Sequence, residues 1–376
     1  MSKIVIYDTE HFETTYALIR IVDLEFNSIT IFADKTTETV LRQMLGEHAN
    51  KFTWVTRSKT DYTTALALYR YCTVHNVTVL FLNTVSHHHL LIAVTSLCLK
   101  KVNVILTVHA ANSFFSPKIS FSPRSILRFL GQKLLRISVS SYAALLSSIR
   151  DYIVENFKIK KNVYLLPGGV FEPDKIKSLS TDPNSQLRIV VPGSIDHYRR
   201  DYQQIFELAN LLELKKQNIQ LILLGTAVGT YGKNVIRQCE SLILKHVQLR
   251  YYDVDFIDPV EYEHQLDSCD FIFLPLTQMC KKPGEQAEEY GRTICSGSFY
   301  DAIRFAKPIL IAENIPLAPE LQDQCFPFPS LPGLCEILSK MSHGEREEIT
   351  TKAFRNSQRF SVTLLRKEIE PLIAPI

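Results

Sequence analysis

Two adjacent arginines, Arg199 and Arg200, stand between a β-rich run and a helical period in the second half of the chain. The run at 188–191 predicts a strand, a Pro-Gly turn follows it, and the apolar spacing from Tyr202 onwards predicts a helix. Guanidinium groups at the carboxyl end of a strand, beside the start of a helix, favour the binding of a phosphate. The alternative is a pair of solvated charges at a helix start, and the turn favours phosphate binding over it.

A second turn suited to anions consists of Ser296, Gly297 and Ser298. Its small side chains could expose the amides at the start of a helix that ends near Lys307-Pro308. Both turns lie in the same half of the chain. Together they predict a ligand with two phosphates, such as a nucleoside diphosphate.

Short β-rich runs alternate with helical periods along the whole chain. The expected strands are 4–7, 28–32, 52–55, 77–82, 102–108 and 163–166 in the first half, and 188–191, 219–224, 248–252, 271–274 and 309–311 in the second. The expected helices of the first half are 12–21, 36–46, 60–75, 88–99, 123–137 and 141–156. Apolar strands that alternate with helices predict buried parallel sheets. We therefore expect an α/β fold of two Rossmann-like, doubly wound parallel-sheet lobes that face a central cleft.

The polar segment 172–186, which contains two prolines, predicts a linker between the lobes. The expected units are an N-terminal lobe at 1–171, a C-terminal lobe at 187–358 and a terminal helix at 359–376. The apolar residues of this last segment recur at roughly helical spacing, so we expect the helix to pack back on the first lobe.

The composition restricts the class of protein. A chain of 376 residues with 46% hydrophobic residues can bury two cores, and a net charge of +3 does not favour nucleic-acid binding. The eight cysteines include no Cys-x-x-Cys pair, which indicates reduced thiols. We expect neither a signal peptide nor a membrane-spanning helix, and therefore a cytoplasmic protein, with the inner face of the cell membrane as a second expected location.

Several short motifs resemble those of one enzyme family. They are the Pro192-Gly193-x(5)-Arg199-Arg200 turn, the Leu223-Leu224-Gly225 turn, the run Cys269–Pro275 and the helix end Ala306-Lys307-Pro308. On these motifs the chain resembles a bacterial glycosyltransferase of the GT-B fold, in the large retaining family that uses nucleotide-diphosphate sugars. The likeness is concentrated in 187–312, and the first lobe matches mainly in pattern.

The resemblance implies how the donor diphosphate is held. In the family a Gly-Arg-x(4)-Lys-like turn binds it. Arg199 occupies the lysine position of that turn, Ser194 occupies the arginine position, and Arg200 would substitute for the missing arginine. The amides of Gly297 and Ser298, with Ser296 before them, would hold the same diphosphate.

The carboxylates depart further from the family pattern, which has two glutamates eight positions apart. The second position falls on Asp301, which would bind the donor ribose, and the first falls on Thr293. Glu288, five residues further upstream, would supply the first acid if a loop insertion keeps it in the cleft, and otherwise this acid is lost. The resemblance also places His109 near the donor sugar, so Glu288 and His109 are the candidate catalytic residues.

Histidines follow three of the expected strands. Ligands of parallel sheets bind beyond the carboxyl ends of strands, so His11 and His87 are candidates on the acceptor side. For His109, which ends a buried strand, a core histidine is the alternative. The run His87–His89 does not predict a metal site, because consecutive side chains diverge and no cysteine or carboxylate pattern accompanies them.

The resemblance implies transfer of a sugar from a nucleotide-diphosphate donor to a glycan, lipid-linked or other hydroxyl acceptor, in surface polysaccharide or glycoconjugate synthesis. A nucleotide-sugar epimerase of the same fold and a non-catalytic nucleotide-sugar-binding subunit stay open as alternatives. Retention of configuration needs no base on the first lobe, whereas inversion would make Glu10, Glu13 or His109 the base. No Asp-x-Asp signature stands in a suitable loop, so we expect metal-independent chemistry without a cofactor.

The segment 114–137 combines aromatic and aliphatic residues with lysines and arginines. A basic amphipathic helix can lie on an anionic membrane surface, and the alternative is a helix packed on the core with its cations reaching into water. We expect a peripheral contact with an anionic membrane through this segment.

Overall fold

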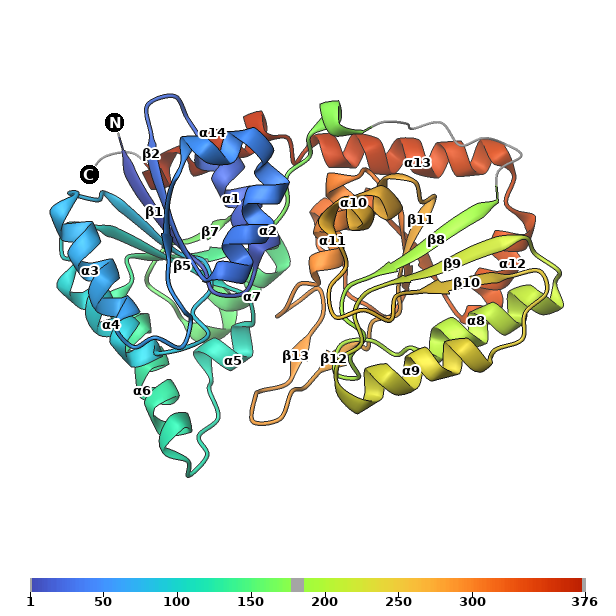
Figure 1. Cartoon of the computed structure of the whole chain (residues 1–376), viewed down its shortest axis with the longest axis horizontal. Helices are drawn as coiled ribbons and strands as arrows, with labels where there is room; N and C mark the ends of the chain where they lie inside the picture. The colour runs from blue at the N-terminus through green and yellow to red at the C-terminus, as the bar shows by residue number, and fades with distance from the viewer. Residues whose placement is uncertain (1, 177–185, 374–376) are drawn as a thin grey trace.

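The structure is a computed structural model that describes residues 2–176 and 186–373. It consists of two lobes, each with a parallel sheet between layers of helices (Figure 1). Most of the expected linker, at 177–185, lies outside the described residues.

The first lobe contains a seven-stranded parallel sheet. Its strands are β1 (Lys3–Tyr7), β2 (Ser28–Ala33), β3 (Thr53–Thr56), β4 (Val79–Leu82), β5 (Asn103–Val108), β6 (Ser141–Ala144) and β7 (Val163–Leu165), in the order β3-β2-β1-β4-β5-β6-β7. Its helices are α1 (Phe12–Val22), α2 (Lys35–Leu45), α3 (Thr64–Val74), α4 (His89–Cys98), α5 (Ala111–Phe115), α6 (Pro123–Ser138) and α7 (Ser147–Phe157). The strand order reverses between β1 and β4, which opens a crevice at their carboxyl ends.

The second lobe contains a six-stranded parallel sheet. Its strands are β8 (Leu187–Pro192), β9 (Ile219–Leu224), β10 (Gln248–Tyr251), β11 (Phe271–Leu274), β14 (Ile309–Ala312) and β15 (Cys325–Phe328), in the order β10-β9-β8-β11-β14-β15. Its helices are α8 (Gln203–Leu214), α9 (Gly229–Ser241), α10 (Pro259–Asp267), α11 (Gly297–Arg304), α12 (Leu331–Lys340) and α13 (His343–Gln358). A short antiparallel pair, β12 (Met279–Cys280) and β13 (Glu288–Glu289), projects towards the first lobe (Figure 1).

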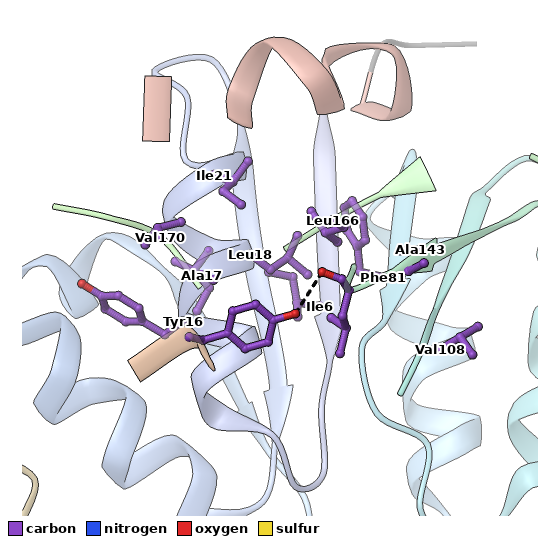
Figure 2. Close-up of a cluster of buried hydrophobic side chains, with 14 of the residues drawn as sticks. Ile6, Tyr16, Ala17, Leu18, Ile21, Phe81, Val108, Ala143, Leu166 and Val170 are labelled. Carbon is purple, nitrogen blue, oxygen red and sulfur yellow. Dashed lines mark hydrogen bonds between the residues drawn. The ribbon is translucent and has the colours of Figure 1, made fainter. Parts of the chain in front are cut away.

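The core of the first lobe forms because apolar strands and the apolar face of α1 bury one another. Ile6 of β1, Phe81 of β4 and Val108 of β5 belong to the same buried cluster as Leu18 and Ile21 of α1 (Figure 2). All five are almost fully buried. Strands buried on both faces read as continuous apolar runs, and this is the pattern from which the parallel sheets were predicted.

The α/β architecture with two parallel sheets is confirmed, but the expected helix at 141–156 is wrong at its beginning. Residues 141–144 form β6, which pairs with β5 and β7, and helix α7 starts only at Ser147. The two alanines of β6 favour a helix, yet burial of Tyr142 and the hydrogen bonds to both neighbouring strands determine the structure locally.

The C-terminal helix α14 (Val362–Ile373) lies on the first lobe, against α1 (Figure 1). Ser2 Oγ donates a hydrogen bond to the carbonyl of Ile373 at 2.7 Å, and Asn103 Nδ2 donates one to the carbonyl of Leu372 at 3.0 Å. The Arg366 guanidinium donates to three backbone carbonyls, two in the last turn of α1 and one directly after its end. Among the helices of the described ranges, none is both long and apolar enough to cross a membrane.

Candidate functional site

A cavity of about 490 Å³ lies between the two lobes. The carboxyl ends of β1, β4 and β5 border it on one side, and the loop after β8 and the start of α11 border it on the other. Every residue that the sequence proposed for the site lines this cavity: His11, His87, His109, Arg199, Arg200, Glu288, Ser296, Gly297, Ser298 and Asp301. The cavity is therefore the candidate site.

Arg200 is the buried cation of this cavity, with only 5% of its surface exposed. Its Nη1 donates to the carbonyl of Ser194 at 3.2 Å, and its Nη2 donates to Ser298 Oγ at 2.9 Å. Nε has no hydrogen-bond partner among the described residues. Gly193 makes room for this side chain, because its φ is +98° and a Cβ there would lie 2.6 Å from Nη2 of Arg200. The guanidinium is thus held in place before any ligand binds.

The start of α11 lies beside Arg200. Ser298 Oγ donates to the carbonyl of Pro192 at 3.2 Å, which fixes the helix start to the end of β8. The Ser296 side chain makes no capping hydrogen bond, and a Cβ built on Gly297 would meet no atom within 4 Å. The first turn of this helix is therefore open towards the cavity, where an anion could accept hydrogen bonds from the backbone amides of the turn.

Arg199 differs from Arg200 in its surroundings. Its side chain is 39% exposed, and its Nε lies 3.6 Å from Oδ2 of Asp196. It stands at the rim of the cavity, close enough to the first lobe for its charge to lower the pKa of His11. The two adjacent arginines therefore present one buried cation and one partly exposed cation.

Asp301 lies one turn further along α11. Tyr262 Oη donates a hydrogen bond to Asp301 Oδ2 at 2.9 Å. Withdrawal from bulk water raises the pKa of this carboxyl to about 6, although the Tyr262 hydrogen bond and the charges of Arg304 and Arg200 oppose the rise. The group is an acceptor for hydroxyls on the second lobe's side of the cavity.

On the opposite side, His11 and His109 form a stacked pair, with ring centroids 4.3 Å apart. Loss of hydration lowers the pKa of His109 to about 3 and that of His11 to about 4, so both rings are neutral at pH 7. Nε2 of His109 lies 2.8 Å from the carbonyl of Asn83, which can only accept, so this nitrogen carries the proton. Nδ1 of His109 is then an acceptor.

Glu13 and His87 complete the first lobe's side. Loss of hydration raises the pKa of Glu13 to about 7, and the charges of Asp301 and Asp8 add to the rise. Glu13 belongs to the first turn of α1, directly after the end of β1. His87 Nδ1 lies 2.9 Å from Ser86 Oγ, in the loop between β4 and α4.

Glu288 comes from β13 but interacts with the first lobe. Its carboxylate accepts the backbone N–H of Ser113 at 2.6 Å and that of Asn112 at 3.2 Å, at the start of α5. The Asn112 side chain in turn donates to the carbonyl of Ala287 at 2.9 Å. Both carboxylate oxygens are thus engaged in a contact between the lobes. This contact gives Glu288 a structural task in addition to its place in the cavity wall, and its catalytic role stays a prediction.

Two contributors to the site were not identified from the sequence. Tyr262 lies in α10, where nothing in its spacing distinguishes it from a packing residue. Lys282 lies between β12 and β13, lines the cavity and lowers the pKa of His11 across the lobes. Among the described residues, no three His, Cys, Asp or Glu side chains come together in a way that could hold a metal ion.

The sequence matches no protein-family model and no curated protein. Solved structures match over nearly the whole chain. The pneumococcal O-GlcNAc transferase GtfA, solved with UDP and GlcNAc, has a TM-score of 0.60 at 9% identity, over 99% of this chain and 98% of that one. The UDP-GlcNAc 2-epimerase of Neisseria meningitidis, bound to UDP-GlcNAc, has a TM-score of 0.58 at 12% identity, over 99% of both chains.

A sucrose-phosphate synthase from Thermosynechococcus elongatus also has a TM-score of 0.58, at 13% identity, over 99% of this chain and 98% of that one. Glycosyltransferases and epimerases thus share this arrangement of two lobes. The likeness confirms that the chain has the GT-B fold, as its motifs predicted.

Proposed function

We propose that the protein is a glycosyltransferase that takes a sugar from a nucleoside diphosphate donor and transfers it to a hydroxyl group. The observation that carries the proposal is Arg200, a buried guanidinium held by Ser194 and Ser298 at the open start of α11. Among the residues of 2–176 and 186–373, no carboxylate forms an ion pair with it. A buried cation of this kind is costly unless an anion joins it, and a diphosphate supplies that anion.

Arg200 and the start of α11 also suit the reaction itself. When the bond between the sugar and the diphosphate breaks, negative charge grows on the leaving phosphate and positive charge grows on the sugar. Fixed donors in a partly dry cavity stabilise that charge more in the transition state than in the ground state. Arg199, at the rim, adds a second cation, and Asp301 would accept hydroxyls of the donor ribose.

The first lobe would supply the acceptor's side. Among the groups considered for removal of a proton, Glu13 suits the task best, because its pKa of about 7 allows it to exchange a proton near neutral pH. His109, with a pKa of about 3, is a weak base and is better suited to accept hydrogen bonds through Nδ1. We assign Glu13 the role of base if the reaction inverts configuration; a retaining reaction would need no base here.

The alternative that the comparisons favour is a nucleotide-sugar epimerase, because a UDP-GlcNAc 2-epimerase has this fold. Such a reaction would use the same diphosphate site, with Glu13 moving a proton of the sugar. A non-catalytic binding subunit would keep the diphosphate site alone. These possibilities differ in product, so one set of assays separates them.

The test is incubation of the full chain with a panel of nucleotide sugars, beginning with UDP-sugars since UDP accompanies GtfA. Release of nucleoside diphosphate that rises with added glycan or lipid-linked acceptor supports a glycosyltransferase. Interconversion of the free nucleotide sugar, followed by NMR, would identify an epimerase. Tight binding without turnover would identify a binding subunit. Unchanged turnover after treatment with a chelator would support metal-independent chemistry.

A further inference from the structure

We propose that the outer face of α4 and α6, with the loop between α5 and α6, is a docking surface for an anionic lipid bilayer. Helix α4 contains no lysine, arginine, aspartate or glutamate. Its exposed positions Leu91, Val94 and Leu97 recur every three residues and form one apolar stripe. A solvated helix normally presents charged side chains at such positions.

Helix α6 lies beside α4 and continues the apolar face. The two helices approach closely at Gly131, where a Cβ would lie 2.4 Å from the backbone nitrogen of Leu90. Only Gly131, Gln132 and Leu135 of α6 are buried, whereas Ile126, Leu127 and Leu130 remain exposed. The helix therefore covers little of its apolar surface with protein.

The loop before α6 forms the tip of this surface. Residues 116–122 lie at the far end of α6, away from the sheet (Figure 1). Phe121 is fully exposed, and Ile119 is more than half exposed. Exposed aromatic and aliphatic side chains at the end of a projecting helix are suited to insertion among lipid tails.

The charges around this face are positive and therefore favour an anionic partner. From Tyr62 to Arg150 the sequence has no aspartate or glutamate, although the whole chain has nearly as many acidic as basic residues. Exposed cations surround the apolar positions: Lys118 and Arg124 at the tip, and Lys133 further along α6. Anionic headgroups complement such a rim. A second copy of the chain does not, because a symmetric contact would bring these cations together.

The inner side of the same helices reaches the site. His89 of α4 and Arg128 and Gln132 of α6 line the cavity between the lobes. A bilayer on the outer face would therefore lie beside the entrance to the cavity and could present a lipid-linked acceptor to it. This consequence rests on the proposed function, whereas the docking itself does not.

The test is sedimentation of the full chain with phosphatidylcholine vesicles that contain or lack phosphatidylglycerol. We expect binding to the anionic vesicles that weakens with added salt, and much weaker binding to the neutral ones. Phe121→Ser with Leu127→Ser, or Lys118→Glu with Arg124→Glu, should lower the partition coefficient about tenfold or more. These side chains are exposed, and unchanged melting temperatures would show that the variants fold.

Matched controls exist on the second lobe. Leu214→Ser with Ile243→Ser removes two other exposed apolar side chains, and Lys233→Glu with Lys245→Glu reverses two other exposed charges. We expect both controls to bind vesicles as the unmodified chain does. Three results would overturn the proposal: no binding to anionic vesicles, an equal loss in the controls, or a dimer in solution that the Phe121 and Leu127 variant abolishes. Since no donor or acceptor enters this assay, it stays independent of the proposed reaction.

Discussion

Replacing Arg200 by alanine tests the diphosphate site most directly. A charge-assisted contact to a partly desolvated phosphate contributes roughly 1.5–3 kcal/mol, so Arg200→Ala should raise the Kd for UDP about 10- to 150-fold. The Kd for uridine, which lacks phosphates, should stay nearly unchanged. Arg200→Lys keeps the charge but loses the fixed pair of donors, so its Kd for UDP should lie between that of the unmodified chain and that of Arg200→Ala.

The effect on folding should be small, which separates binding from stability. The Arg200 guanidinium donates to a carbonyl and a hydroxyl and forms no ion pair within the described residues, and Ser298 Oγ keeps its bond to Pro192 when the guanidinium is removed. At a UDP concentration of 100 times the unmodified Kd, ligand binding stabilises the unmodified chain by about 2.7 kcal/mol. A variant with a hundredfold higher Kd keeps only about 0.4 kcal/mol of this.

Isothermal titration with UDP and uridine, together with melting curves with and without UDP, measures both quantities. Arg199→Ala is the matched control, and we expect a smaller rise in Kd because its side chain is partly exposed and screened by water. If Arg200→Ala folds and binds UDP as tightly as the unmodified chain, the diphosphate binds elsewhere. If uridine and UDP weaken equally, Arg200 only supports the shape of the cavity.

Three further changes test the rest of the site. Gly297→Val should leave the melting temperature nearly unchanged, because a Cβ at this position meets open space. In titrations it should weaken UDP binding about tenfold or more. A loss of fold without a selective loss of affinity would show that the turn is merely structural. In the folded chain Glu13 keeps its proton up to about pH 7, against 4.5 for its ordinary pKa, so the chain loses stability as the pH rises through this window. Relative to the unmodified chain, the free energy of unfolding of Glu13→Gln should therefore be about 2–3 kcal/mol higher at pH 8 than at pH 4. A difference in denaturant midpoint between the two chains that is the same at both pH values would contradict this. Glu288→Gln should cost about 1–3 kcal/mol of stability through the amides of α5, with UDP affinity preserved; full stability with abolished turnover would instead show a catalytic role.

The sequence predicted those parts of the fold that depend on local patterns. Continuous apolar runs such as 79–82 and 271–274 identified buried strands, because both faces of a parallel sheet are covered. Strand β6 was missed since its alanines favour a helix, and β15 was missed because it contains Pro327, which an edge strand tolerates. In both strands, tertiary contacts outweigh local preference.

The candidate site was predictable to a similar degree. Turn chemistry identified the arginine pair and the small residues at the start of α11, because both motifs are local in the chain. It could not decide which arginine is buried, since that depends on Ser298. It also could not show that Glu288 binds the start of α5, a contact between residues 175 positions apart. Such contacts leave no periodic signal.

Two of the places where the second lobe contacts the first bear on how the cavity can open. One is the return of the chain from α13 into α14, and the other is the hairpin of β12 and β13, whose Glu288 binds α5 (Figure 1). They lie at opposite ends of the boundary between the lobes. Hydrogen bonds join the lobes elsewhere as well: Tyr300 Oη donates to the carbonyl of Leu145 at 2.9 Å, and Ser148 Oγ donates to the carbonyl of Gly291 at 2.6 Å. A donor that enters by separation of the lobes must therefore break such contacts, whereas Arg200 and the start of α11 stay together on the second lobe because Arg200 is hydrogen-bonded to Ser298.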